Sequence, residues 1–394
     1  MVAHYRYGCQ DNIGYIMGIL NQSSNAHYTL SRKQIGGTWH SPQASAITYG
    51  DNLNGNYSAS NRGFLVFQPN GKNFRMNSGS GTSDSIGFSF TWTWTVPAGV
   101  NEITVLCIGA GGGAAATGSN RGGAGGAGGA LQWATGTSTP GDTWEIVAGS
   151  NGYTSGSSFT APGIAGGGSG VRANGSSSFC VWAKGGNGGP GAPSSGVGSA
   201  AVSTTNRFAV ARSGCLSVIS SSGGGDGGES GEARYNSAGG AGGGAGGYSG
   251  TGGTGSSSNG NTGGSAGAGG GGGGGGSNAS QCGGGGGVGR YGEGSSGAAP
   301  LSGAGGGGGS GGGNGTTGNY ASDGGDYGGG GGADDDDLSS GANFNGDGGR
   351  GCVVITWGYT STQKIPLSYD YSSEEVLYQQ GSSGTGINIG TQTA

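Results

Sequence analysis

The stretch that decides the fold is Gly122-Gly123-Ala124-Gly125-Gly126-Ala127-Gly128-Gly129-Ala130, in which a larger residue returns at every third position. A similar spacing recurs at Ala245, Tyr248, Thr251 and Thr254, with mainly Gly and Ser between them. A period of three differs from the roughly 3.6 residues of an α-helical turn and the roughly two of a strand. It is the period of the extended polyproline II helix, which has no internal hydrogen bonds. We therefore expect polyglycine helices that bond sideways through two glycine faces, with the larger residues on a third, outward face.

Glycine makes up 109 of the 394 residues, against an ordinary usage of about 7%. A collagen helix is excluded, because runs such as Gly269 to Gly276 are pure glycine and the chain has only 9 prolines. Disorder is the alternative for such a composition. The local three-residue period and the β-rich sequence on both sides favour packed helices, whose mutual hydrogen bonds would offset the cost of ordering glycine.

Strand patterns bracket the glycine. Residues 88–96 alternate aromatic and small polar side chains, and residues 102–108 become apolar on both faces, as in an interior strand. Further strands are expected at 131–136 with 143–148 as a pair, and at 179–183, 208–219 and 352–357. The expected fold class is mainly β: a small N-terminal module, then a β-sandwich framework that encloses a stack of polyglycine II helices.

Three regions are expected along the chain. Residues 1–85 form an attachment or assembly module, with a short helix after Asp11-Asn12 and a hairpin that turns at Asn70-Gly71. Residues 86–358 form the glycine-rich domain. Residues 359–394 form an extended C-terminal arm.

The charge balance limits the partners. The net charge is −5, the pI is near 5.1, and no basic stripe exists, which argues against nucleic-acid binding. No segment reaches the roughly 18 apolar residues of a membrane span, so membrane insertion is not expected. The first residues lack the apolar core of a secretory signal peptide, and we expect the chain not to use the general secretory route.

The cysteines give no metal or redox motif. The 6 cysteines are scattered without a C-x-x-C pair. Cys107, Cys180 and Cys352 lie in apolar strand patterns, which favours buried free thiols. A disulfide between framework strands remains an alternative.

No constellation for catalysis is apparent. His4, His27 and His40 lack metal-ligand spacing, and the chain has no nucleophile elbow, Walker loop or framed carboxylate pair. We therefore expect no enzymatic activity, no cofactor and no metal. The run of four aspartates at 334–337 has the oxygen ligands that Ca²⁺ prefers, but without an EF-hand pattern a solvated loop tip is the favoured interpretation.

Aromatic residues between the C-terminal glycine runs are the candidate binding residues. Glycine runs offer no core for an aromatic ring, so these rings are expected at the surface or at turns, beside charged neighbours as in binding loops. The alternative is that they cap helix ends or pack on one another. The candidate receptor-binding residues are Arg234, Tyr235, Arg290, Tyr291, Tyr320, Tyr327, Asp334, Asp335, Asp336 and Asp337.

Two stretches resemble a known family. The first is Trp94-Thr95-Val96-Pro97-Ala98-Gly99-Val100-Asn101-Glu102-Ile103-Thr104-Val105-Leu106-Cys107-Ile108-Gly109-Ala110-Gly111-Gly112-Gly113, and the second is Gly348-Gly349-Arg350-Gly351-Cys352-Val353-Val354-Ile355-Thr356-Trp357. They are similar to the opening and the end of the glycine-rich domain of phage tail-fibre proteins, over about residues 88–358. The runs with variable segments between them also resemble the distal adhesins of T-even-type phages.

The resemblance implies a virion protein, assembled in the host cytoplasm and extracellular in the particle. Its loops would bind a host cell-surface glycan or outer-membrane protein. Its other partners would be tail-fibre or virion proteins, in a homo-oligomer or as a cap on an oligomeric fibre. Residues 1–85 and the arm after Trp357 depart from the family pattern.

Two other functions fit the same sequence. One is a purely structural virion or filament protein, such as a fibre, collar or decoration protein, that makes subunit contacts only. The other is ice binding by outward residues such as Ala124, Ala127, Thr251 and Thr254.

Overall fold

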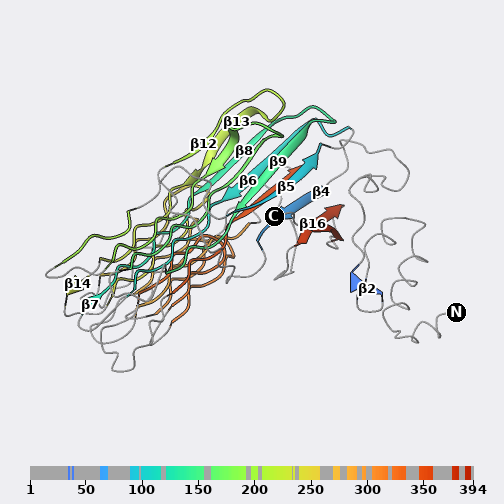
Figure 1. Cartoon of the computed structure of the whole chain (residues 1–394). Coiled ribbons are helices and arrows are strands. Elements are labelled where there is room, and N and C mark those ends of the chain that lie inside the picture. The colour runs from blue at the N-terminus through green and yellow to red at the C-terminus, as the bar shows by residue number, and fades with distance from the viewer. Residues whose placement is uncertain are drawn as a thin grey trace.

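The computed structural model describes residues 34–35, 38–39, 63–69, 89–96, 99–116, 121–154, 161–191, 197–202, 206–232, 234–235, 239–257, 269–275, 282–290, 295–298, 304–317, 322–333, 346–357, 375–380 and 387–391. These residues contain strands and irregular runs but no helix, which confirms a mainly β chain. The strands of the two large sheets lie together, and the glycine runs extend away from them (Figure 1). The short helix expected after Asp11-Asn12 lies outside the described residues.

Two antiparallel sheets form the framework. The five-stranded sheet has the order β12 (Arg207–Ala209), β11 (Phe179–Ala183), β10 (Ser169–Ala173), β9 (Thr143–Gly149), β5 (Ser89–Thr95). The seven-stranded sheet has the order β13 (Ser217–Gly225), β8 (Leu131–Thr137), β6 (Glu102–Ile108), β15 (Cys352–Trp357), β4 (Gly63–Phe67), β16 (Glu375–Gln380), β17 (Ile387–Thr391). Two small sheets pair β7 (Arg121–Gly122) with β14 (Arg234–Tyr235), and β2 (Gln34–Ile35) with β3 (Thr38–Trp39).

The main core contains side chains from both large sheets. The alternation predicted for residues 88–96 is confirmed in β5, where Trp92 and Trp94 are buried and Thr93 is exposed. The Trp94 ring meets the Trp144 ring edge to face at 5.3 Å and lies stacked 6.4 Å from Trp357, between ring centroids. These rings connect strands of the two sheets, so aromatic burial holds the sandwich together.

The central strands β6 and β15 are buried on both faces, as predicted for residues 102–108. In β15, Val353 and Ile355 belong to the main core, whereas Cys352 and Val354 pack in a second cluster with Tyr327. This second cluster lies between the seven-stranded sheet and the glycine runs. The sheet is therefore a middle layer that contacts both regions.

One expected pairing and the extent of one expected strand are wrong, although extended segments exist in both places. Residues 131–137 and 143–149 form β8 and β9, but these strands lie in different sheets, so their connection crosses between layers. The single strand expected at 208–219 is divided into β12 and β13, with Gly214 between them at a left-handed φ of 68°. The local sequence predicts which segments are extended, but contacts with residues far away in the sequence determine which strands pair.

Strand β4 joins the sheet through strands that are distant in the sequence. It pairs with β15 on one edge and with β16 on the other, and the hairpin turn expected at Asn70-Gly71, with the residues after it, lies outside the described residues. The expected N-terminal module and C-terminal arm thus both contribute strands to the framework sheet. The limits of the three regions stay a prediction.

The cysteines divide into two kinds. Cys180 is joined to Cys215 by a disulfide, which corrects the expectation of a free thiol there. Cys107 and Cys352 are free and buried, as expected.

We call the hydrogen-bonded glycine-rich runs the glycine array, which comprises residues 109–116, 121–130, 149–154, 161–168, 184–191, 225–232, 239–247, 250–257, 269–275, 282–289, 304–309, 312–317, 322–333 and 346–351. The N–H groups of one run donate in three directions, with donors of one direction three residues apart. In run 109–116, Gly109, Gly112 and Ala115 donate to run 121–130, Ala110, Gly113 and Ala116 to run 161–168, and Gly111 and Ala114 to run 346–351.

Run 239–247 is enclosed on all sides. It donates hydrogen bonds to runs 121–130, 250–257 and 282–289, and it accepts them from runs 225–232, 269–275 and 322–333. Contacts this close leave no room for side chains: a Cβ at Gly128 would lie 1.9 Å from Gly244 O. Glycine is therefore required at contacts of this kind.

The outward face expected for larger residues exists only on peripheral runs. Thr251 and Thr254 are exposed, but Ala124, Ala127 and Ala245 are fully buried. The expectation is wrong for these alanines because their runs have neighbours on every side, so the methyl groups lie between runs.

Candidate functional site

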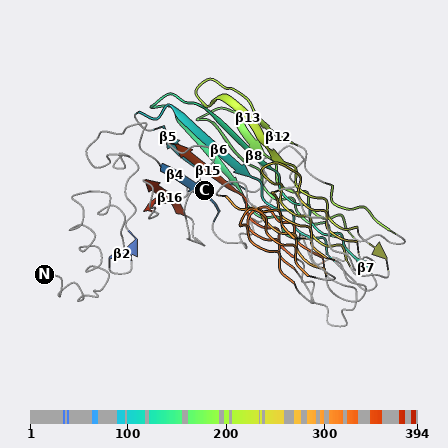
Figure 2. The same ribbon diagram turned by 180° about the vertical axis from the view of Figure 1, so that it is seen from behind.

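The array has a sandwich end and a remote end. Figures 1 and 2 show β7 and β14 far from the two large sheets. In this pair, Arg234 is opposite Gly122 and Tyr235 is opposite Arg121. The candidate residues Arg234 and Tyr235 therefore lie at the remote end.

Two other candidate segments are bracketed by described residues of the remote end. Ser322 follows the segment that contains Tyr320, and Gly332 and Gly346 bracket the segment that contains the four aspartates. Gly332 N–H donates to Ser322 O at 2.7 Å, and Gly346 N–H donates to Gly332 O at 3.1 Å. The flanks of both segments are thus bonded together. Tyr291, Tyr320 and Asp334–Asp337 themselves lie outside the described residues.

Arg290 and Tyr327 are at the other end of the array. Only 5% of Arg290 and 7% of Tyr327 is exposed, so the expectation that they form surface loops is wrong. The Tyr327 hydroxyl donates to Gln68 Oε1 at 2.6 Å, and Arg290 Nη1 donates to the same oxygen at 2.7 Å. The ring has a core to fill here because the seven-stranded sheet packs against the array.

A second arginine completes this buried cluster. Arg350 forms an ion pair with Asp326 at 3.2 Å and donates to Pro69 O at 3.2 Å. The guanidinium carbons of Arg290 and Arg350 lie 5.2 and 5.6 Å from the centroid of the Tyr327 ring, within cation–π range. The cluster joins the end of β4 to the array, and a buried charged group with several partners is suited to fixing geometry.

Burial sets the titration behaviour around the cluster. Burial raises the pKa of the Tyr327 hydroxyl well above its usual range, although Arg290 opposes the shift. Burial also raises the pKa of the neighbouring Cys352 thiol to about 12. Both groups stay protonated at neutral pH, so neither supplies a nucleophile or a general base there.

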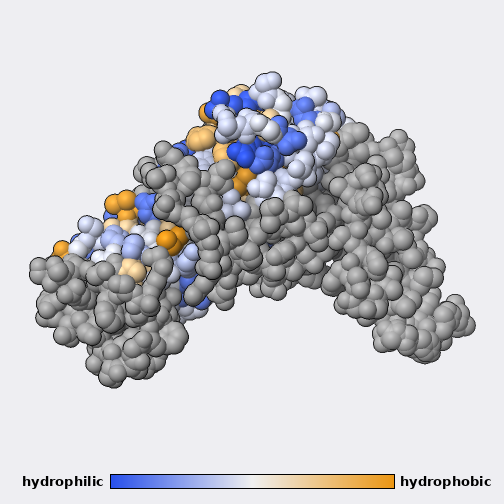
Figure 3. All heavy atoms as spheres, viewed as in Figure 1, coloured by the Kyte–Doolittle hydropathy of each residue, from blue (hydrophilic) through white to orange (hydrophobic). Residues whose placement is uncertain are grey.

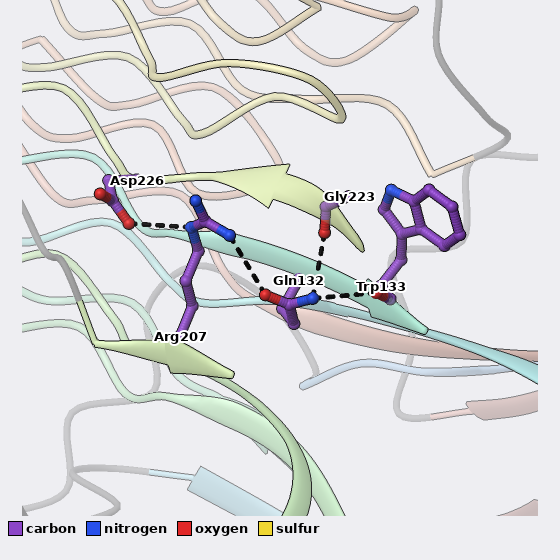
Figure 4. Close-up of polar contacts among 5 residues, drawn as sticks. All are labelled: Gln132, Trp133, Arg207, Gly223 and Asp226. Carbon is purple, nitrogen blue, oxygen red and sulfur yellow. Dashed lines mark hydrogen bonds and ion pairs between the residues drawn. The ribbon is translucent and has the colours of Figure 1, made fainter. Parts of the chain in front are cut away.

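A further polar chain connects the two sheets. Arg207 on β12 donates to Asp226 Oδ1 at 2.9 Å and to Gln132 Oε1 at 3.2 Å, as Figure 4 shows. Gln132 Nε2 in turn donates to Gly223 O at 3.1 Å. The chain of contacts ties the edge of the five-stranded sheet to β8 and β13. No sequence motif distinguishes these residues.

Other kinds of site find little support among the described residues. In that part of the chain, no group of three His, Cys, Asp or Glu side chains is arranged to hold a metal ion. The search of the same residues for a helix able to cross a membrane finds none. On the face of the molecule that Figure 3 shows, the hydrophobic residues among those described form small separate groups.

Comparison with known proteins adds no assignment. No protein-family model matches the chain, and no curated protein matches it significantly.

Proposed function

We propose that the chain is a non-enzymatic virion protein, a tail-fibre tip adhesin that binds a host cell-surface receptor through segments at the remote end of the glycine array. The observation that carries the proposal is the grouping of chain connections there. The described ends of different connections meet at this end: Ala116 N–H donates to Ala161 O, and Ala333 N–H donates to Gly240 O. Segments mounted side by side on a rigid scaffold are the usual arrangement of binding loops.

We further propose that the array consists of polyglycine II helices. The support is the period of three in its donors, together with the absence of room for a Cβ at glycine contacts such as Gly126, where it would lie 2.0 Å from Gly112 O. Because the runs bond through backbone atoms, the segments at their ends can differ in sequence while the scaffold is kept.

Arg290 and Tyr327 no longer belong to the proposed receptor site, because both are buried at the sandwich end. Tyr291 directly follows Arg290 in the sequence and is left out of the proposed site with it. The site retains Arg234, Tyr235, Tyr320 and Asp334–Asp337. The proposed receptor is a surface glycan or an outer-membrane protein, and the proposed location is the virion, with other tail-fibre or virion proteins as partners. Cofactors, nucleic acid and membrane insertion have no part in this function.

The test is binding of the purified, fluorescently labelled protein to a panel of bacterial strains. In the test variant, residues 318–321 and 334–345 are replaced by Gly/Ser segments of equal length. In the control variant, residues 291–294, next to the sandwich-end residue Arg290, are replaced in the same way. We expect binding to a narrow set of strains that the test variant loses and the control keeps.

Two results would contradict the proposal. Equal binding by the wild type and the test variant would exclude these segments as the receptor site. Absence of binding to any strain, with self-association in solution, would favour a purely structural fibre, collar or decoration protein.

A further inference from the structure

The disulfide between Cys180 and Cys215 links the two sheets on one side of the sandwich. Cys180 lies on β11 of the five-stranded sheet, and Cys215 lies just before β13, an edge strand of the seven-stranded sheet. The edge strands β12 and β13 contact each other and lie side by side in Figure 1. The bond therefore ties the two layers together where their edges meet.

Backbone hydrogen bonds hold both cysteines in place independently of the bond. Val210 N–H donates to Cys180 O at 2.8 Å, which fixes the end of β12 against β11. Cys215 N–H donates to Arg212 O at 3.2 Å, and Arg212 N–H donates to Leu216 O at 3.2 Å, so Cys215 lies in a closed turn. The two cysteine Cα atoms are 6.5 Å apart, within the range that a disulfide spans. The fold itself therefore brings the two thiols together.

The site also accommodates the reduced thiols, and it gives them unequal access. Cys180 Sγ lies 3.2 Å from Val171 O, so a reduced Cys180 thiol has a hydrogen-bond acceptor in the same position. Cys180 is fully buried, whereas Cys215 is 4% exposed and follows Ser213 and Gly214, which are exposed. A reagent in solution therefore reaches Cys215 first.

We propose that Cys180 and Cys215 form a redox lock: the chain folds with both thiols reduced, and a small-molecule disulfide such as oxidised glutathione then joins them. The Cys215 thiolate attacks the small disulfide and releases one small thiol. The Cys180 thiolate then attacks the sulfur of Cys215 and releases the second small thiol, so the protein loses two electrons and two protons and the small disulfide gains them. Cys107, Cys282 and Cys352, which are free and buried, take no part.

The setting of this step rests on the proposed virion function. The cytoplasm keeps thiols reduced, whereas disulfides persist outside the cell. A virion protein passes from the first setting to the second, so the lock closes after assembly. The bond joins residues 35 positions apart and restricts the unfolded chain, so the released protein resists unfolding more strongly.

The first test compares the full chain in its reduced and oxidised forms. We expect the reduced protein to unfold cooperatively. Oxidised glutathione should join Cys180 to Cys215, as peptide mass spectrometry would show, and raise the melting temperature by about 5–10 °C. A reduced chain without a cooperative transition would show that folding needs the bond. Failure of the bond to form, or an unchanged melting temperature, would equally overturn the lock.

The second test identifies the point of entry. In the reduced wild type, a brief treatment with N-ethylmaleimide should label Cys215 ahead of Cys180. Cys180→Ala should take up glutathione at Cys215, whereas Cys215→Ala should leave Cys180 unmodified. Labelling of Cys180 first, or of both cysteines at one rate, would overturn entry at Cys215, and the wild-type labelling decides this even if a variant fails to fold.

The third test concerns the setting. Protein trapped with N-ethylmaleimide during lysis of the expressing cells should have both thiols free, and a bond already present there would overturn closure after release. None of the three tests measures binding to host cells. A failure of the lock is therefore distinguished from a failure of the proposed receptor binding.

Discussion

The sandwich and the glycine array reach close packing by opposite means. In the sandwich, large side chains such as Trp94 and Trp144 fill the space between sheets. In the array, the backbone of one run contacts the backbone of the next, and a Cβ at most contacts would lie within 3 Å of a neighbouring atom. A core can thus be specified by the size of its side chains or by their absence.

The largest expected effect is in the sandwich. Trp144→Ala removes a fully buried ring, and we expect a loss of about 3–5 kcal/mol in the free energy of unfolding. Denaturant unfolding measures it. Thr93→Ala, at an exposed position of the adjacent strand β5, is the control and should change stability little. A small loss for Trp144→Ala would show that the sandwich does not depend on side-chain packing.

The opposite change should damage the array. Gly273→Ala adds a Cβ that would lie 2.0 Å from Thr254 O, and we expect a loss of about 1–3 kcal/mol, as for overpacked cores. The measurement is again the free energy of unfolding. Gly313→Ala, whose Cβ would lie 3.0 Å from its nearest neighbours on an exposed run, should cost less. Equal stability of Gly273→Ala and the wild type would contradict backbone-to-backbone packing.

Gln68 tests how the two regions are joined. Gln68→Ala removes the oxygen that accepts hydrogen bonds from Tyr327 and Arg290, and leaving buried donors without it should cost about 1–3 kcal/mol. Amide exchange should accelerate first at the array glycines next to Tyr327. Equal acceleration in β5, which lies in the other sheet, would mean that the cluster supports the whole fold rather than the junction.

The smallest expected effect is that of pH on the free energy of unfolding, through the buried Cys352 and Tyr327 between the sandwich and the array. Below about pH 8 the Cys352 thiol is mostly protonated in both the folded and the unfolded chain. At higher pH the unfolded chain loses this proton first, because burial raises the folded pKa to about 12, so stability falls with rising pH. Burial raises the pKa values of Tyr327 and Cys107 in the same direction. Melting temperatures from pH 8 to 9 measure the fall, and Cys352→Ala should make it shallower.

The sequence predicts the local features of this fold better than it predicts the contacts between distant residues. The alternation of residues 88–96 and the apolar faces of residues 102–108 identify two strands, since those patterns are local. The burial of Tyr327 follows from Gln68, which is 259 residues away. The glycines that flank Tyr327 in the sequence predict an exposed ring. Its hydrogen-bond partner, Gln68, follows strand β4 and belongs to no recognisable motif, so the sequence does not indicate the contact. The polar chain through Arg207 and Gln132 is equally hidden, because its members are 75 residues apart.

The three donor directions of a run constrain how its length can change. Each residue turns the donor direction by a third of a revolution, so one inserted residue redirects every donor beyond it. In the proposed polyglycine II geometry, an insertion or deletion of three residues changes the run by one turn, about 9 Å, and leaves every direction unchanged. Related chains with the same array should therefore differ by multiples of three residues within runs, and by any number in the connections at the remote end.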